Sequence, residues 1–451
     1  MEALKENKMG VLPVKKLVIT MSLPMMLSML VQALYNIVDS VFVARISEDA
    51  LTGVTLAFPI QQLMIAIGSG TGVGVNALLS KSLGEKKFDR ADTAANMGLF
   101  LNFLSFIVML LFGIFLTGTF MRSQTDVASI VSDGTAYLQI CCCASLGLFS
   151  QIMLERLLQS TGRTVFSMVS QLTGALVNLI LDPIMIFGFL GCPKLGVRGA
   201  ALATVIGQFC AAGVGLILNL RKNPEIHLSF RAILRPNGET IKRIYAVGIP
   251  SILMMSIGSV MTYMMNRILI VFSTTAAAVF GVYFKLQSFF FMPLFGLNNG
   301  IIPIIAFNYG ARRPERVRST MRFALLLAMG IMCIGALIFA AFPDILLSLF
   351  DASPEMRKIG VPALRIICIH FPIAAVCIIL GSTFQAFSKS MYSLVVSVMR
   401  QLVVLIPCAW LLAQTGIVTN VWWAFPIAEV MSLTVTLIYY RRLHRKIIST
   451  L

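Results

Sequence analysis

Charged side chains are scarce in this sequence, above all the acidic ones. Only 12% of the 451 residues are charged, and 19 Asp and Glu stand against 36 Lys and Arg. A soluble domain carries about 25% charged residues, so this shortage excludes an ordinary water-soluble fold. Apolar residues make up 58% of the chain, and its mean hydropathy is +0.88. Lipid is therefore the solvent for most of the surface.

The sequence also lacks the alternation of polar and apolar residues that marks outer-membrane β-strands. Its apolar residues form continuous runs, each long enough for a helix to cross a hydrocarbon core about 30 Å thick. The first run is too long for a cleaved signal peptide, and eleven more follow it. We expect an all-α integral membrane protein with twelve transmembrane helices, at residues 17–44, 51–80, 93–120, 134–159, 165–190, 197–220, 244–272, 275–306, 319–342, 359–386, 391–413 and 421–440.

Metal-binding patterns are absent as well. The nine Cys show no metal-ligand spacing, and most lie in apolar runs, where packing accounts for them. The three His are scattered, which argues against a histidine-based metal site. Only His370, which lies within a span, remains a candidate polar residue.

The net charge of +17 reflects membrane topology rather than nucleic-acid binding. Most Lys and Arg fall in segments that share one side of the membrane, among them 81–90, 221–243, 312–322 and 441–446. Such positively charged segments stay in the cytoplasm. We therefore expect a multi-pass protein of the bacterial inner membrane with both termini cytoplasmic and no nucleic-acid partner.

The two halves of the chain repeat each other at an offset of 226 positions. Each half holds six runs, so both enter the membrane from the same side, which is a parallel repeat. We expect an N-terminal six-helix bundle at 1–220, a cytoplasmic linker at 221–243 and a C-terminal six-helix bundle with a short tail at 244–451. Equivalent positions include Pro24 and Pro250, Phe58 and Phe284, Gln61 and Gln287, Gly70 and Gly296, Gly84 and Gly310, and Arg90 and Arg316.

Asp39 is an acid near the outer end of the first run. A charge in mid-membrane costs at least about 2.5–3.5 kcal/mol on insertion scales, so its presence needs a reason. Tyr35 lies one turn earlier on the same helix face, and Gln32 lies on the same side. Two interpretations stay open: Asp39 belongs to a buried polar site, or it is a solvated residue at a helix end marked by Arg45.

The fifth run carries one polar stripe on an otherwise apolar helix. Gln171, Gly174, Asn178 and Asp182 recur at helical spacing. Pro183 follows and disfavours helix at Asp182, which predicts a broken helix there. Asp182 either caps this break or forms a proton or hard-cation site with the Asn178 carbonyl. Nearby carboxylates and oxygen ligands suit such a site, and the stripe favours it.

The second half has no aspartate at the positions equivalent to Asp39 and Asp182, and the one acid in its spans is Glu429. In the first half, Glu155 and Arg156 belong either to a second polar stripe or to an interfacial pair near the cytoplasm. The intramembrane cations of the second half are Lys285, Arg365 and Arg400.

Six segments form a recognisable set: LPMMLSMLVQALYNIVDSVFVAR, LQSTGRT, LVNLILDPIMIFG and GVRGAALAT, with the loops LGEKKFDRA and YGARRPERV. In these segments the chain resembles the multidrug and toxic compound extrusion (MATE) family, in particular its DinF-like bacterial branch. The resemblance covers essentially the whole chain. It implies a secondary antiporter, not an enzyme, that exports organic and often cationic drugs or toxic compounds in exchange for protons or sodium.

The resemblance also implies that the coupling site lies in the first bundle. A proton or Na⁺ would be held by Asp39, Asn178, Asp182 and Thr204, with Tyr35 beside them. No other cofactor is implied, and we expect a monomer that binds small organic substrates within the lipid bilayer. We expect the substrate cavity to include Gln32, Gln61, Gln171, Gln287 and Asn266.

The NorM-like branch of the family places acids in helices seven and ten, and both stretches lack them here. The sequence therefore gives no basis for predicting a coupling site in the second bundle, and it leaves open whether that bundle holds a second ion site. The main alternative is a flippase for lipid-linked oligosaccharides or lipids, with a cationic cavity. A membrane aspartyl protease is disfavoured because no GxGD motif surrounds either aspartate, and a channel because the acidic site is confined to one half. The cations available to a flippase are Arg267, Lys285, Arg365 and Arg400.

Overall fold

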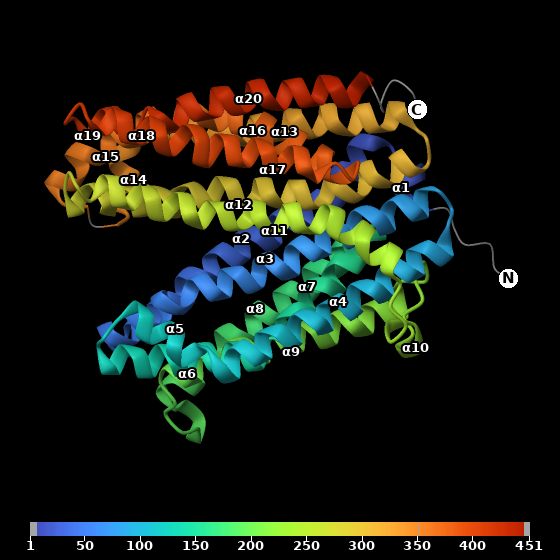
Figure 1. Ribbon diagram of the computed structural model, residues 1–451, viewed down its shortest axis with the longest axis horizontal. Coiled ribbons are helices and arrows are strands. Elements are labelled where there is room, and N and C mark those ends of the chain that lie inside the picture. The colour runs from blue at the N-terminus through green and yellow to red at the C-terminus, as the bar shows by residue number, and fades with distance from the viewer. Residues whose placement is uncertain (1–6, 351, 446–451) are drawn as a thin grey trace.

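The computed structural model describes residues 7–350 and 352–445, and most of this part is helical (Figure 1). Within these residues, eleven helices are long and apolar enough to cross a membrane. A twelfth span results if α6 (Ala128–Cys143) and α7 (Leu146–Ser160) count as one, since they are bent by 48° at a short break. The predicted all-α membrane-spanning fold is confirmed, and the run expected at 134–159 is this bent pair.

The helices follow the order of the predicted runs. The long helices of the first half are α2 (Val14–Ala44), α3 (Glu48–Gly84), α4 (Phe88–Phe115), α8 (Thr164–Phe187) and α9 (Val197–Lys222). Those of the second half are α11 (Gly238–Leu269), α12 (Thr274–Gly310), α13 (Pro314–Ala341), α15 (Pro354–Ile367) with α16 (Phe371–Ala386), α17 (Ser390–Val398) with α18 (Ile406–Ala413), and α20 (Ala424–Leu443). Shorter elements are α1 (Lys8–Val11), α5 (Thr117–Gln124), η1 (Phe189–Gly191), α10 (Phe230–Ile233), α14 (Pro343–Ser348), η2 (Cys368–His370), the π-helical η3 (Met399–Leu405) and α19 (Val418–Val421).

Helix starts repeat in the two halves along with the sequence. The Ser47 hydroxyl accepts from the Ala50 N–H over 3.0 Å at the start of α3. Ser273, 226 positions later, accepts from the Ala276 N–H over 3.0 Å at the start of α12. Each serine satisfies an N–H group that the first helical turn leaves free. The second long helix of each half therefore begins in the same way.

The break predicted at Asp182 is not found. Helix α8 continues through Pro183 to Phe187, and Gly188 then ends it in the left-handed conformation (φ 78°). A proline this close to the helix end removes one backbone hydrogen bond, and the glycine a turn later supplies the actual stop. Asp182 is therefore a helical residue of the last two turns rather than the cap of a kink.

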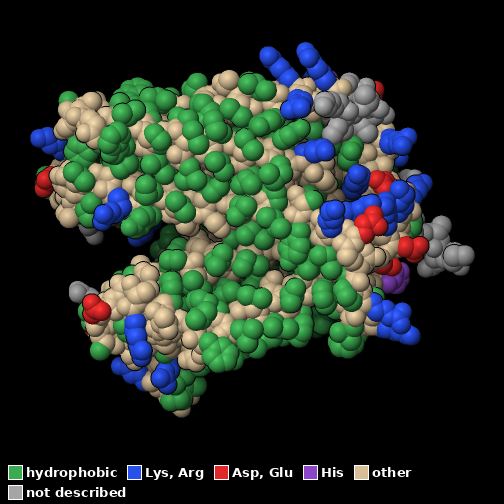
Figure 2. All heavy atoms as spheres, viewed as in Figure 1, with side chains coloured by type: hydrophobic (Ala, Val, Ile, Leu, Met, Phe, Trp, Pro, Cys, Tyr) green, Lys and Arg blue, Asp and Glu red, His purple; other side chains and the backbone are tan. Residues whose placement is uncertain are grey.

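The helices form two groups with a hollow between them. Figure 1 shows α2–α9 on one side and α11–α20 on the other, with α1 at one end of the molecule. We call this end the α1 end and the opposite one the far end. Figure 2 shows that the surface is hollowed between the groups at the far end. The groups meet where α2 packs against α12 and α3 packs against α11.

The buried apolar residues do not divide along the same line. One large core joins side chains of both halves, among them Met21 and Val75 from the first and Ile244 and Ile301 from the second. A smaller core lies within the first half alone and includes Ala50, Leu138 and Ile186.

Candidate functional site

Three helices of the first half bring the predicted acids together. Asp39 and Tyr35 come from α2, Asn178 and Asp182 from α8, and Thr204 from α9. Helices α2 and α9 both pack against α8, and the polar stripe of α8 faces inward, with Asp182 fully buried and Asn178 3% exposed. The five residues of the predicted coupling site therefore lie within one buried polar cluster.

The hydrogen bonds of this cluster close on the amide of Asn178. When its nitrogen points toward Asp182, it donates to Asp182 Oδ2 over 2.8 Å. Its oxygen then accepts from the Tyr35 hydroxyl over 3.1 Å and from the Thr204 hydroxyl and backbone N–H over 2.9 Å each. The opposite orientation would set the amide oxygen against the carboxylate, so electrostatics selects the first. Asn178 thus orients the Asp182 carboxyl group.

The two carboxyl groups are also hydrogen-bonded to each other. A carboxylate can only accept, so one of the pair must hold a proton in this arrangement. Asp39 Oδ1 and Asp182 Oδ1 are both buried without a hydrogen-bond partner. Unpartnered buried oxygens require explanation. A proton on a carboxylate oxygen would satisfy them, and so would a hard cation such as Na⁺, which carboxylate, amide and hydroxyl oxygens can ligate together.

Two further layers of polar residues adjoin the cluster. On one side, Gln171 Nε2 donates to Gln32 Oε1 over 2.8 Å, and Gln171 Oε1 has no partner. On the other, Gln61 Nε2 donates to the Tyr137 hydroxyl over 3.0 Å. Tyr137 is 3% exposed. Sequence reasoning missed Tyr137, since a single tyrosine in an apolar run carries no signal of its own.

The two remaining cavity predictions lie elsewhere. Asn266 and Gln287 are half-buried on α11 and α12 of the second half, outside the cluster. Their part in the substrate cavity stays a prediction, and it would place them on the wall that the second half contributes.

Glycines allow the two halves to pack closely toward the α1 end, where α3 crosses α12. A Cβ atom on Gly84 would lie 2.0 Å from the Phe307 carbonyl oxygen, and one on Gly310 would lie 2.2 Å from that of Lys81. Phe307 and Gly310 stand 226 positions after Lys81 and Gly84, so the crossing obeys the sequence repeat. Only residues without a side chain permit this approach. We call this crossing the seam.

A short N-terminal segment lies across the same end. Arg316 Nη2 donates to the carbonyl oxygens of Met9 (3.0 Å) and Leu12 (2.8 Å), and its Nε donates to Asn308 Oδ1 (3.0 Å). On the first half, Asn7 Nδ2 donates to the Thr161 carbonyl oxygen over 3.1 Å. Residues 7–12 therefore connect the second half to the first through hydrogen bonds, and we call this segment the strap.

We expect Arg316→Met to detach this strap from α12 and α13. Hydrogen bonds made by a charged donor contribute about 1.5–3 kcal/mol each, so the variant should melt at a lower temperature in detergent. Arg322→Met, a change of an exposed arginine on the same helix, is the matched control. Equal melting temperatures for the two variants would show that the strap adds no stability.

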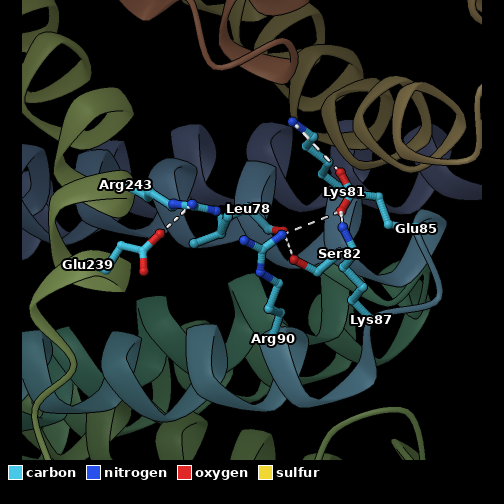
Figure 3. Close-up of polar contacts among 8 residues, drawn as sticks. All are labelled: Leu78, Lys81, Ser82, Glu85, Lys87, Arg90, Glu239 and Arg243. Carbon is cyan, nitrogen blue, oxygen red and sulfur yellow. Dashed lines mark hydrogen bonds and ion pairs between the residues drawn. The ribbon is translucent and has the colours of Figure 1, made fainter.

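Charged residues interact at the end of α3, next to Gly84 in the sequence (Figure 3). Glu85 lies 2.8 Å from Lys87 Nζ, 3.6 Å from Arg90 Nη1 and 3.9 Å from Lys81 Nζ. Burial acts to raise the pKa of Glu85, but the Lys87 hydrogen bond and the three cations outweigh it and lower that pKa below its ordinary value. The loop that ends α3 is therefore held by an ionised carboxylate.

Taken together, these features define a class of protein. The chain is a helical, multi-pass membrane protein of two packed halves, with a hollow between them and a cluster that contains two acids in the first half. This is the organisation of a secondary transporter. A sequence model of the MatE family matches residues 24–184 and again residues 250–411, which is most of the chain. The chain belongs to the MatE family of multidrug efflux transporters, whose members are not enzymes.

Similar proteins agree with this assignment over more than nine-tenths of their length. Multidrug export protein MepA of Staphylococcus saprophyticus is 24% identical over 421 residues, 93% of this chain and 92% of that protein. A multidrug resistance MATE family transporter solved in its outward-facing conformation gives a TM-score of 0.92 at 22% identity, over 100% of this chain and 99% of that one. A MOP superfamily transporter from Pyrococcus furiosus, described as having a binding pocket of reverse polarity, gives 0.89 at 22% identity over 98% of each chain. The family expected from sequence is confirmed, and the solved structures establish the fold.

Proposed function

We propose that this protein is an antiporter that exports organic, often cationic, compounds in exchange for protons or Na⁺. The N-terminal bundle (1–220) and the C-terminal bundle (244–451) would rock about the linker (221–243) and open the central hollow to each side in turn. The protein would sit in the bacterial inner membrane with both termini in the cytoplasm.

The Asp39–Asp182 pair carries this proposal. Its two carboxyl groups share a hydrogen bond, and each keeps one buried oxygen without a partner. Such a pair changes its charge when an ion binds or leaves. An acid pair without an ion is negative and attracts a cationic substrate to the same half, so ion and substrate compete. Competition of this kind makes the ion and the substrate cross the membrane in opposite directions (antiport) rather than together (symport).

The surface charge supports the orientation. Lys and Arg gather at the α1 end in Figure 2, and membrane proteins keep such residues in the cytoplasm. The hollow then faces the outside, and the seam closes the cytoplasmic side. The structure would represent the outward-open state of the transport cycle.

The flippase alternative finds little support in the second half. Arg400 Nη1 lies 3.4 Å from Glu429 Oε2, so its charge is compensated within the bundle. Arg365 Nε donates to the Ala340 carbonyl oxygen over 3.2 Å. These two cations are therefore engaged with their own bundle.

Gradient-driven uptake of ethidium into everted vesicles tests the proposal. A pH difference of one unit supplies about 1.4 kcal/mol per proton, enough for about tenfold accumulation of a monovalent cation. We expect an acidic lumen or a Na⁺-rich lumen to drive uptake into vesicles that contain the protein, and the effective gradient identifies the ion. Vesicles without the protein are the control. Failure of both gradients would contradict the antiport proposal and favour the flippase.

A further inference from the structure

The strap lies between the two halves at the α1 end. Met9, near its centre, is fully buried and belongs to the large core that both halves share. On the second half, a Cβ atom on Gly10 would lie 3.2 Å from the ring of Phe307, a residue of the seam. On the first half, a Cβ atom on Gly162, in the turn between α7 and α8, would lie 3.4 Å from Met9 Cγ. The two halves therefore cannot part at this end unless the strap leaves one of them.

The second half holds the strap by its backbone. The Met9 carbonyl oxygen accepts from Asn308 Nδ2 over 3.1 Å and from Arg316 Nη2 over 3.0 Å. Arg313 Nη1 donates to the Gly10 carbonyl oxygen. Two of these three donors are guanidinium groups, and hydrogen bonds from charged donors are stronger than those between neutral groups. Because the acceptors are main-chain atoms, a change of side chain in the strap leaves these bonds in place.

The first half holds the strap by a side chain. In residues 7–12 as the structure describes them, the hydrogen bonds to the first half and the linker come from Asn7. Its Nδ2 donates to the Thr161 carbonyl oxygen over 3.1 Å and to Glu225 Oε2 over 2.6 Å. Its Oδ1 accepts from the Met9 N–H over 2.9 Å and so caps α1. One amide therefore both starts the short helix of the strap and attaches it to its neighbours.

The contacts of the neighbouring segments show which half each side of this attachment follows. Glu225 lies in the linker, but the His227 N–H donates to Asp92 Oδ1 on α4 over 2.7 Å, so this part of the linker is fixed to the first half. The strap runs into α2, whose start packs on the second half, since a Cβ atom on Gly300 of α12 would lie 2.5 Å from a side-chain atom of α2. The hydrogen bonds of Asn7 therefore cross the division between the halves.

We infer that the strap is a latch on the closed α1 end, and that Asn7 is the residue at which it releases. When the α1 end opens, the bonds of Asn7 to Thr161 and Glu225 break, whereas the strap stays on α12 and α13 through its backbone. The latch stabilises the closed end and lowers the fraction of time for which that end is open. This inference rests on the proposed alternating access and adds a segment and a release point to it.

Asn7→Asp breaks the release point alone. The new carboxyl group still caps α1, but it cannot donate to the Thr161 carbonyl oxygen and it repels the Glu225 carboxylate. Loss of a hydrogen bond to a charged group should raise the population with an open α1 end at least about tenfold. Asn237→Asp is the matched control, because it makes the same change at the exposed N-cap of α11, where the side chain accepts from the Thr240 N–H.

Distances between pairs of spin labels report both the opening and the path of the strap. The labels are placed at three exposed positions after replacement of the nine native cysteines: Val11→Cys in the strap, Asp89→Cys in the first half and Glu315→Cys in the second. In Asn7→Asp, the distances from Asp89→Cys to both other labels should lengthen in a larger fraction of molecules. The distance between Val11→Cys and Glu315→Cys should stay as it is. Asn237→Asp should change none of the three.

A double variant separates a lost hydrogen bond from a damaged strap. In Asn7→Asp/Glu225→Gln the donor and the acceptor are exchanged, because the glutamine amide can donate to the new carboxylate. It should restore the distances of the parent protein, which a misfolded strap would not do. Lengthening between Val11→Cys and Glu315→Cys, with the distance from Val11→Cys to Asp89→Cys kept, would show that the strap follows the first half and would overturn the inference.

Gly84→Ala, which inserts a methyl group into the seam, distinguishes failure of the latch from failure of alternating access. No ion gradient is imposed, so the distances do not depend on the coupling ion. If Gly84→Ala separates Asp89→Cys from Glu315→Cys but Asn7→Asp leaves all three distances unchanged, the latch is wrong and alternating access stands. If neither variant separates them, alternating access itself fails, and the latch fails with it.

Discussion

We expect Asp39→Asn and Asp182→Asn each to abolish gradient-driven export of an organic cation. Asparagine keeps the size and hydrogen-bonding capacity of the side chain, but it can neither carry a negative charge nor take up a proton. Each variant leaves one carboxyl group of the hydrogen-bonded pair. The pair can then no longer exchange its ion for a cation, and uptake into everted vesicles should fall to the level of vesicles without the protein.

The control for these variants is Asp126→Asn, which changes an exposed acid in the same half. It should transport as well as the unmodified protein. Surface expression and melting temperature of all three variants show whether they fold. Folded Asp39→Asn and Asp182→Asn proteins that transport normally would mean that both acids serve structure alone.

Placing side chains in the seam should have the second large effect, because it forces the seam apart. Gly84→Ala and Gly310→Ala each place a methyl group about 2 Å from a carbonyl oxygen of the other half, so the helices must separate by roughly an ångström. Overpacking of this kind costs about 1–3 kcal/mol. The closed α1 end should lose population by about ten- to a hundredfold, and transport should fall with it.

Spin labels at two exposed positions, Asp89→Cys and Glu315→Cys, are attached after the nine native cysteines have been replaced, and the distance between them measures this shift. The rate at which a cysteine placed in the seam reacts with a water-soluble thiol reagent measures it independently. Gly330→Ala is the matched control, since a Cβ atom there meets no other atom within 4 Å. We expect it to leave both distance and transport unchanged. A closed seam in the Gly84→Ala protein would show that the crossing can relax without opening.

The sequence predicts the spans well because a helix needs a continuous run of about 20 apolar residues to cross the hydrocarbon core of the membrane. It does not predict the break between Cys143 and Leu146, because the residues there are as apolar or small as their neighbours. Conversely, Pro183 signals a break that does not occur, because the loss of one hydrogen bond near a helix end is easily tolerated. Local composition thus predicts where a helix can cross but not how it bends.

The acid cluster could be predicted because placing a charged side chain inside a membrane costs free energy, so each such residue calls for an explanation. Asp39 and Asp182 are rare charges in apolar runs, and helical spacing places Tyr35 and Asn178 beside them. Their joint geometry, which depends on α2, α8 and α9 packing together, is not encoded in any local pattern. The same limit applies to Arg156 and Asn299, which are 143 positions apart and meet only because the two halves cross.

Ion flux driven by a substrate gradient tests the central claim most directly. Proteoliposomes are loaded with ethidium and diluted into dye-free buffer, with no pH or Na⁺ gradient imposed, and the internal pH and Na⁺ are followed. If the protein is an antiporter, dye leaving the liposomes must draw H⁺ or Na⁺ inward, and Asp39→Asn/Asp182→Asn liposomes must show no such ion entry. Dye efflux through the unmodified protein without movement of either ion would contradict the exchange on which the whole account depends.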